Sequence, residues 1–230
     1  EVQKIDSKIS ALKQRFIPNP ELMNGTLVIY KQGEGGENMT NIITKIRQNF
    51  PNLSIHIMND SDSSDITTEM YDIGFVGTTS PPEDSIATLL GELNMHIYGS
   101  KEYLKKVKNV NDFQWVTYKR KDQADTNFVV KTFFKDPNII ISSNSYQDAH
   151  AFVSSGNGAA FLTELDGEND SRLKSYKKEE YSFKIGFYLI QHELSRSNPI
   201  VRAVKKLILE NIDELLRQTN YVSGYDQKKP

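Results

Sequence analysis

Few side chains in this sequence have the types and spacing that catalysis needs. The chain has no cysteine, which excludes disulfides, thiolate metal sites and cysteine nucleophiles. No GxSxG element occurs, and the loop GEGGEN has neither the spacing of a dinucleotide fingerprint nor a following Lys-Ser or Lys-Thr. The four histidines are scattered singly, without metal-ligand spacing: His56, His96, His150 and His192. We therefore expect no enzyme activity, no metal and no cofactor.

One glycine-rich loop has the composition of a small-molecule site. It follows the first predicted strand and leads to Asn38, a predicted helix N-cap. Its first residues are Lys31, Gln32, Gly33 and Glu34. The glycines let the backbone approach a ligand, and a helix N-terminus carries unpaired N–H groups and a partial positive charge. The same glycines also suit a permissive turn with no ligand.

A second candidate set lies in the later half of the chain. Asn144 precedes Ser145, which has the capping-box spacing to Asp148, and Thr163 follows the next predicted strand. We expect Asn144 and Thr163 to contact a ligand. We expect Ser145 to serve as a helix cap.

The elements around these loops alternate between short apolar strands and amphipathic helices, which is typical of a mostly parallel sheet with crossover helices. Strands are predicted over 26–30, 53–58, 73–76, 93–98, 138–141 and 183–190. Helices are predicted over 38–50, 126–134 and 145–153, and a long closing helix follows Pro199. The segment 166–180 is predicted to be a charged surface loop.

The first sixteen residues carry an apolar residue every three or four positions, which is an a/d pattern. A helix this short is marginal alone in water, so its stripe packs either on the domain itself or on a second subunit. Pro18 and Pro20 end the helix, and a hinge is expected there.

The composition indicates a folded protein with nearly equal numbers of positive and negative side chains. The 28 Lys and Arg nearly balance the 30 Asp and Glu, leaving a net charge of −2, so this domain alone should not bind DNA well. No apolar run approaches the roughly 18–20 residues that span a bilayer. The lack of cysteine fits the cytoplasm, which we expect, but also fits the periplasm.

Four blocks, in this order, resemble the effector-binding domain of LysR-type transcriptional regulators. They are GTLVIY with a helix ending in NFPNLSIHI, then MYDIGFVGT, LLGELNMHIYGSKEYL and NSYQDAHAFVSSGNGAAFLTEL. Together they cover residues 25–218. The chain departs from the family pattern in a polar segment over 60–70 that is about one helical turn shorter than usual, and in lacking the proline often found after the strand in NGAAFLTEL.

The resemblance implies an α/β, type II periplasmic-binding-protein fold, in which two Rossmann-like lobes are joined by two crossing strands. The crossing strands would be 93–98 and 183–190. The chain would divide into a partial linker helix and hinge at 1–24, lobe I at 25–93 plus 191–218, lobe II at 94–190 and a tail at 219–230. Since the family's linker helix pairs two subunits, the resemblance favours the dimer interpretation of the first helix.

The resemblance also adds two site residues and a ligand class. Ser61 and Asp62 occupy the place from which family members present a hydroxyl to the ligand. The family's effectors are frequently small carboxylates, which Lys31 would suit. If Glu34 and Asp62 face the ligand, an amino-acid-like or amine-bearing molecule is equally suited.

Two functions follow as alternatives. The first is the effector-sensing domain of a LysR-type regulator, a homodimer or homotetramer that binds DNA only through a missing N-terminal winged helix-turn-helix and does not bind membranes. The second is a periplasmic solute-binding protein of a transporter with the same fold. The start without methionine fits a processed chain, but only the first function explains an a/d helix before the first strand.

Overall fold

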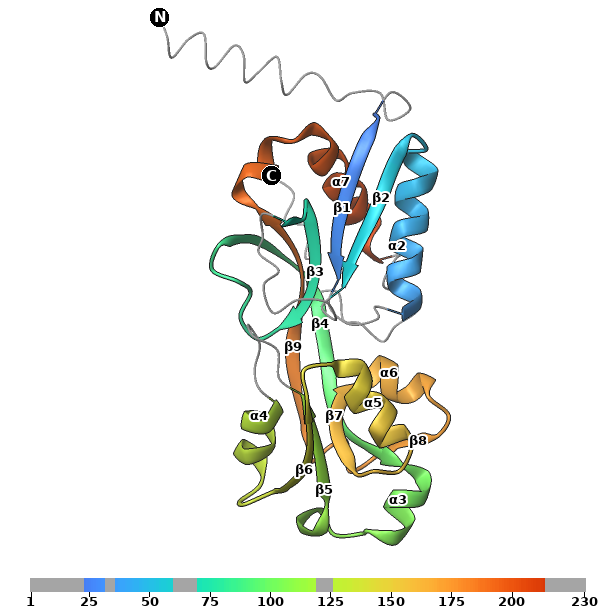
Figure 1. Ribbon diagram of the computed structural model, residues 1–230, viewed down its shortest axis with the longest axis vertical. Coiled ribbons are helices and arrows are strands. Elements are labelled where there is room, and N and C mark those ends of the chain that lie inside the picture. The colour runs from blue at the N-terminus through green and yellow to red at the C-terminus, as the bar shows by residue number, and fades with distance from the viewer. Residues whose placement is uncertain (1–22, 32–35, 60–69, 119–125, 214–230) are drawn as a thin grey trace, which may run out of the picture.

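The computed structural model describes residues 23–31, 36–59, 70–118 and 126–213, and its elements form an elongated molecule (Figure 1). In chain order they are β1 (Gly25–Lys31), α2 (Gly36–Asn49), β2 (Leu53–Asn59), β3 (Ile73–Thr78), β4 (Ser85–Ser100), α3 (Lys101–Lys106), η4 (Val110–Asp112), β5 (Gln114–Tyr118), α4 (Thr126–Phe133), β6 (Asn138–Ser143), α5 (Tyr146–Ser154), β7 (Ala159–Thr163), α6 (Glu164–Asn169), β8 (Leu173–Ser175), β9 (Ser182–His192), η5 (Glu193–Ser197) and α7 (Pro199–Glu210).

Two groups of parallel strands are joined by one long antiparallel pair. The hydrogen-bonded order is β2-β1-β3-β9-β4-β7-β5-β6, and β8 pairs with β4. Strand β1 is parallel to β2 and β3, and β5 is parallel to β6 and β7. The path is continuous because β4 and β9 run through both groups, as the two strands in the middle of Figure 1 show. The two predicted crossing strands correspond to β4 and β9.

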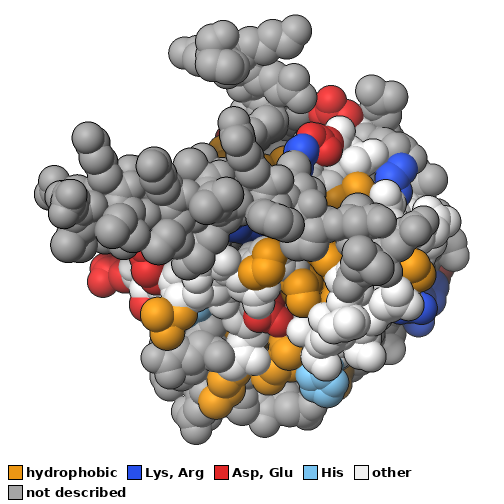
Figure 2. Space-filling view, turned by 90° about the horizontal axis from the view of Figure 1, so that it is seen from above, with side chains coloured by type: hydrophobic (Ala, Val, Ile, Leu, Met, Phe, Trp, Pro, Cys, Tyr) orange, Lys and Arg blue, Asp and Glu red, His pale blue; other side chains and the backbone are white. Residues whose placement is uncertain are grey.

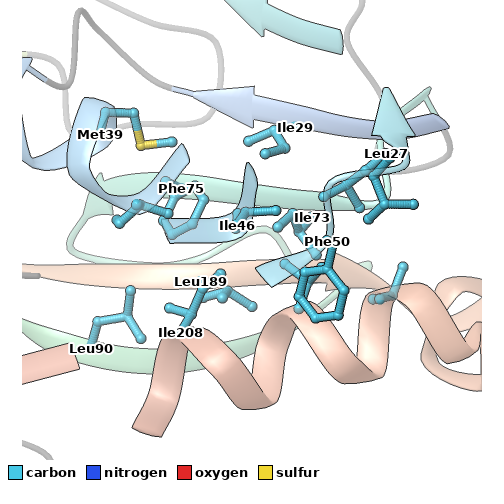
Figure 3. Close-up of a cluster of buried hydrophobic side chains, with 14 of the residues drawn as sticks. Leu27, Ile29, Met39, Ile46, Phe50, Ile73, Phe75, Leu90, Leu189 and Ile208 are labelled. Atoms are coloured by element: carbon cyan, nitrogen blue, oxygen red, sulfur yellow. The ribbon is translucent and has the colours of Figure 1, made fainter. Parts of the chain in front are cut away.

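The first group has its apolar core on one face of the sheet, under α2 and α7. Ile29 of β1, Ile42 of α2 and Val204 of α7 are each fully buried in it. Figure 3 shows side chains from β1, α2, β3, β9 and α7 pointing into this one layer. Helix α7, whose apolar positions recur every three or four residues, therefore closes the part of the fold that β1 begins.

The second group buries apolar side chains on both faces of its sheet. Trp115 on β5 belongs to the cluster beneath α4, where its ring stacks on Phe134 with centroids 4.9 Å apart. Val116, the next residue, points the other way into the cluster beneath α5, because successive strand residues alternate between faces. The sequence prediction of core packing for Trp115 is confirmed.

Three predicted boundaries were wrong. Strand β4 begins at Ser85 rather than at Leu93, because its first half pairs with the end of β9. Helix α2 begins at Gly36, so Asn38 lies inside its first turn and is not its N-cap. The segment 166–180 is not a loop, since it contains most of α6 and all of β8. The first half of β4 depends on a partner distant in the chain, which no local pattern reveals.

Residues 1–22 of the predicted linker helix and hinge (1–24) and the whole predicted tail (219–230) lie outside the described residues, and the proposed lobe limits remain a prediction. None of the described helices is long and apolar enough to cross a membrane. Seen from above, the described side chains of the first group mix hydrophobic, acidic and basic types (Figure 2).

The fully buried position of Leu27 in the first core predicts a large effect of truncation. Leu27→Ala should lower the free energy of unfolding by about 2–5 kcal/mol, because it removes buried apolar surface and leaves a cavity. Leu194→Ala, at a side chain that is 77% exposed, should change it by less than about 0.5 kcal/mol. Urea denaturation followed by circular dichroism measures both, and equal effects would contradict the assigned core.

Candidate functional site

The carboxyl ends of the two parallel groups face each other along the crossing strands. Thr78, the last residue of β3, is in register with Gly186 of β9. Thr163, the last residue of β7, is in register with Met95 of β4, which in turn pairs with Phe183. From Phe183 to Gly186 is three residues, or about 10 Å of extended strand. Open α/β sheets bind ligands at such carboxyl ends, so these two facing edges form the candidate site.

A hydrogen-bond network occupies the edge of the second group at the end of β7. The Thr163 hydroxyl donates to Asp166 Oδ2 at 2.6 Å and accepts from the Asp166 N–H at 3.1 Å, which caps α6. The Tyr146 hydroxyl donates to the same carboxylate oxygen at 2.6 Å and accepts from the Thr163 N–H at 3.2 Å. Burial raises the pKa of Tyr146 well above its usual value, so the phenol is a stable donor. Thr163 is therefore a helix cap as well as an edge residue.

The sequence identified Thr163 but missed Tyr146 and Asp166. Asp166 stands three residues after Thr163, which is the spacing of an N-cap and its N3 acid, and this signal was available. Tyr146 could not have been found in this way. Only the packing of α5 beside the end of β7 brings its hydroxyl to Thr163.

The other loop of the second group begins where β6 ends. Asn144 is exposed there, directly before α5. Ser145 caps α5 by accepting from the Asp148 N–H at 3.2 Å, as predicted. The reciprocal half of the predicted capping box is wrong: the Ser145 N–H donates to the Ser143 hydroxyl at 3.0 Å, and that hydroxyl donates to Asp148 Oδ2 at 3.0 Å. The Ser143 hydroxyl therefore bridges the Ser145 N–H and the Asp148 carboxylate, which a capping box would have joined directly.

The edge of the first group lies opposite, and only one of the predicted ligand residues lies there among the described residues. Lys31 is the last residue of β1 and is half-buried. Thr78 at the end of β3 is buried, and its hydroxyl donates to the Ser80 carbonyl at 2.9 Å. The predicted ligand residues Gln32, Gly33, Glu34, Ser61 and Asp62 lie outside the described residues.

Lys31 thus lies on one edge, and Asn144 and Thr163 lie on the other. Asn144 and Thr163 are linked by Tyr146. This residue is the first of α5, two positions after Asn144, and its hydroxyl accepts from the Thr163 N–H.

A polar cluster adjoins the site where β4 passes α6. Glu164, the first residue of α6, accepts from the Asn94 side-chain amide and from the Lys178 ammonium, each at 3.0 Å. These hydrogen bonds, Asn94 first, lower the pKa of Glu164. His96 Nε2 lies 3.9 Å from the same carboxylate, while His96 Nδ1 is buried and has no hydrogen-bond partner in the described chain. Burial lowers the pKa of His96, so the neutral imidazole is favoured.

The double role of Thr163 predicts a stability loss. Thr163→Val removes the α6 cap and a hydrogen bond to Asp166, and should lower the free energy of unfolding by about 1–2 kcal/mol. Thr132→Val is the matched control, since the exposed Thr132 hydroxyl donates to the Phe128 carbonyl one turn earlier in α4 and caps no helix. Chemical denaturation compares them, and a Thr163 variant no less stable than the Thr132 variant would contradict the capping role.

The buried imidazole of His96 predicts a pH effect. In the folded state, burial lowers the pKa of His96 below its ordinary value of 6.5. As the pH falls, His96 of the unfolded chain is therefore protonated at a higher pH than His96 of the folded protein. This contribution to stability is present above the unfolded pKa and is lost as the pH falls through the folded pKa. Between about pH 7.5 and about pH 5.5, His96→Gln should lose less free energy of unfolding than the unchanged protein. Equal losses in denaturation curves at the two pH values would refute it.

Comparison with known proteins shows which family has this arrangement of strands and helices. The profile of the family described as LysR substrate binding domain matches residues 35–213. Full-length AphB of Vibrio cholerae, an LTTR family protein, is similar with a TM-score of 0.61 at 11% identity, over 91% of this chain and 76% of that one. The regulatory domain of CrgA from Neisseria meningitidis has a TM-score of 0.63 at 14% identity, over 83% and 100%.

The effector binding domain of QuiR, solved in complex with shikimate, has a TM-score of 0.68 at 12% identity, over 84% of this chain and 99% of that one. Among curated protein sequences, none matched. The similarities confirm the predicted type II periplasmic-binding-protein fold and do not favour the transporter alternative. Because the family profile spans most of the sequence, the chain belongs to the LysR substrate-binding domain family, with which LysR-type transcriptional regulators sense their effectors.

Proposed function

We propose that this domain binds a small amino-acid-like or carboxylate metabolite between its two facing edges and performs no chemistry on it. Binding then modulates DNA binding by an N-terminal winged helix-turn-helix outside this sequence, in a cytoplasmic homodimer or homotetramer. The observation that carries the proposal is the register that sets the ends of β3 and β7 opposite each other, about 10 Å apart along β9. The contact residues are the eight predicted ones, Lys31, Gln32, Gly33, Glu34, Ser61, Asp62, Asn144 and Thr163.

The described charges support an amino-acid-like effector over a simple anion. At the second edge both helices carry a Ser or Thr cap that accepts from one N–H group, and an acid in the first turn whose negative charge disfavours an anion there. Glu164 and Asp166 add negative charge there, and the nearby Lys178 ammonium is paired with Glu164 and Glu168. A carboxylate is better placed toward Lys31 on the opposite edge. An amine or hydroxyl is better placed toward the second edge.

Separate cores support a sensing mechanism based on movement of two lobes. The first core draws on residues 23–90 and 187–212, and the second group's clusters draw on 95–185. This division supports lobes close to the proposed 25–93 plus 191–218 and 94–190, except that Phe187 and Leu189 pack in the first core. A ligand that contacts both lobes binds one interlobe angle more tightly than others, and that difference in affinity is what a regulator requires. The structure of the similar QuiR domain with shikimate supports a small organic ligand in this fold.

A thermal-shift screen tests the proposal. The panel contains the twenty common amino acids, small hydroxycarboxylates and shikimate, and a true ligand at one hundred times its Kd stabilises the domain by about 2.7 kcal/mol. Lys31→Ala should weaken binding of the active compound about tenfold or more, because it removes the cation that faces the carboxylate. Lys174→Ala, at an exposed lysine of β8, is the control. A panel without any active compound, or equal binding by the two variants, would reject the proposal.

A further inference from the structure

The crossing pair has an irregularity at the level where the first group ends. Opposite Tyr188 of β9 stands Leu89 of β4, but opposite Phe187 stands Gly91, so Leu90 is an extra residue in β4. Such a β-bulge bends its strand and increases the local twist. The bulge lies within the last levels of the first group, because β3 still pairs with Tyr188 and Phe187 there.

A glycine on the other strand adjoins the bulge. Gly186 is in register with Glu92 of β4 and with Thr78, the last residue of β3. Its φ is not in the left-handed region, so the backbone conformation does not require glycine. A Cβ at this position would instead lie 2.3 Å from Tyr188 Cε2 and 2.6 Å from both Tyr188 Cζ and the hydroxyl oxygen. Glycine is present because the Tyr188 ring occupies the space of a side chain.

The ring of Tyr188 spans from the first group onto the crossing. It packs against the small cluster formed by Tyr71, Val76 and Ile190 on the face of the sheet opposite α2 and α7. From there it leans over Gly186, at the last level where β3 still pairs with β9. Beyond Gly186, only β4 accompanies β9 until the second group begins with Phe183 opposite Met95. The ring thus lies on the two-stranded link between the groups (Figure 1 shows the link).

We propose that Tyr188 is a positioning residue for the two groups: its ring, resting on Gly186 beside the β4 bulge, is a steric stop that sets the angle of the crossing strands. A two-stranded ribbon bends toward one face only if that face can shorten, and a ring that fills the space above Gly186 on that face resists the shortening. The ring carbon Cε2 is the atom nearest to the position of a Cβ at Gly186, so we assign the effect to the ring.

Distances between spin labels test this in the full chain without any effector, so the outcome does not depend on the proposed ligand. The chain has no cysteine, and exposed Lys106 on α3 and Arg202 on α7 provide one labelling site in each group as cysteine variants. Gly186→Ala should move the main interlabel distance away from its original value, because the new Cβ displaces the ring. Tyr188→Ala should broaden the distance distribution, because the stop is gone.

Two further variants separate the ring from other causes. Tyr188→Phe keeps the ring and should leave the distribution unchanged. The double variant Gly186→Ala with Tyr188→Ala should match Tyr188→Ala alone, since no ring remains to displace. An unchanged distribution in Gly186→Ala, a shift that persists in the double variant, or a shift in Tyr188→Phe would each overturn the proposal. If Gly186→Ala fails to fold by circular dichroism, the comparison of Tyr188→Ala with Tyr188→Phe decides, and equal distributions reject the stop.

Discussion

The antiparallel pairing of β4 with β9 is the constraint on which the rest of the molecule depends. The register runs from Ser85 opposite His192 to His96 opposite Ser182, so one ladder passes through both groups of strands. Every parallel strand is positioned, directly or through a neighbour, on one of these two strands. The ladder therefore fixes which strand ends face each other and at what separation. A one-residue slip would turn the buried face of either strand to solvent, and this gives the register its specificity.

At the second edge of the candidate site, the polar groups are used by the fold itself. Thr163, Tyr146 and Asp166 satisfy one another at 2.6–3.2 Å, and Ser143, Ser145 and Asp148 do the same at the neighbouring helix start. Such networks hold side chains in fixed directions, since each member has a partner to lose. A ligand would then meet a preorganised surface in which the acidic groups are already placed, and this constrains its chemistry more than any single residue does.

Flexibility between the two groups has a physical basis in the same ladder. Each group has its own apolar core, so bending the link disrupts neither core. Between the level of Gly186 and that of Phe183 the described link is two strands wide, and the bulge of β4 lies just before it, at the level of Tyr188 and Phe187. Two rigid bodies on a narrow ribbon can adopt few relative positions, and a molecule bound between them selects among those positions.

By itself the sequence indicated the family through four motif blocks and excluded cysteine chemistry through its composition. It also determined the α/β class and the order of most strands and helices, because apolar periodicity and turn residues act locally. It located Ser145 as a cap and Thr163 at a strand end for the same reason. Only the tertiary structure decided that β4 starts at Ser85 and that Tyr146 meets Thr163. Each of these rests on a contact between residues well separated in the chain. Spacing within one segment carries no information about the partner that burial and hydrogen bonding will bring to it.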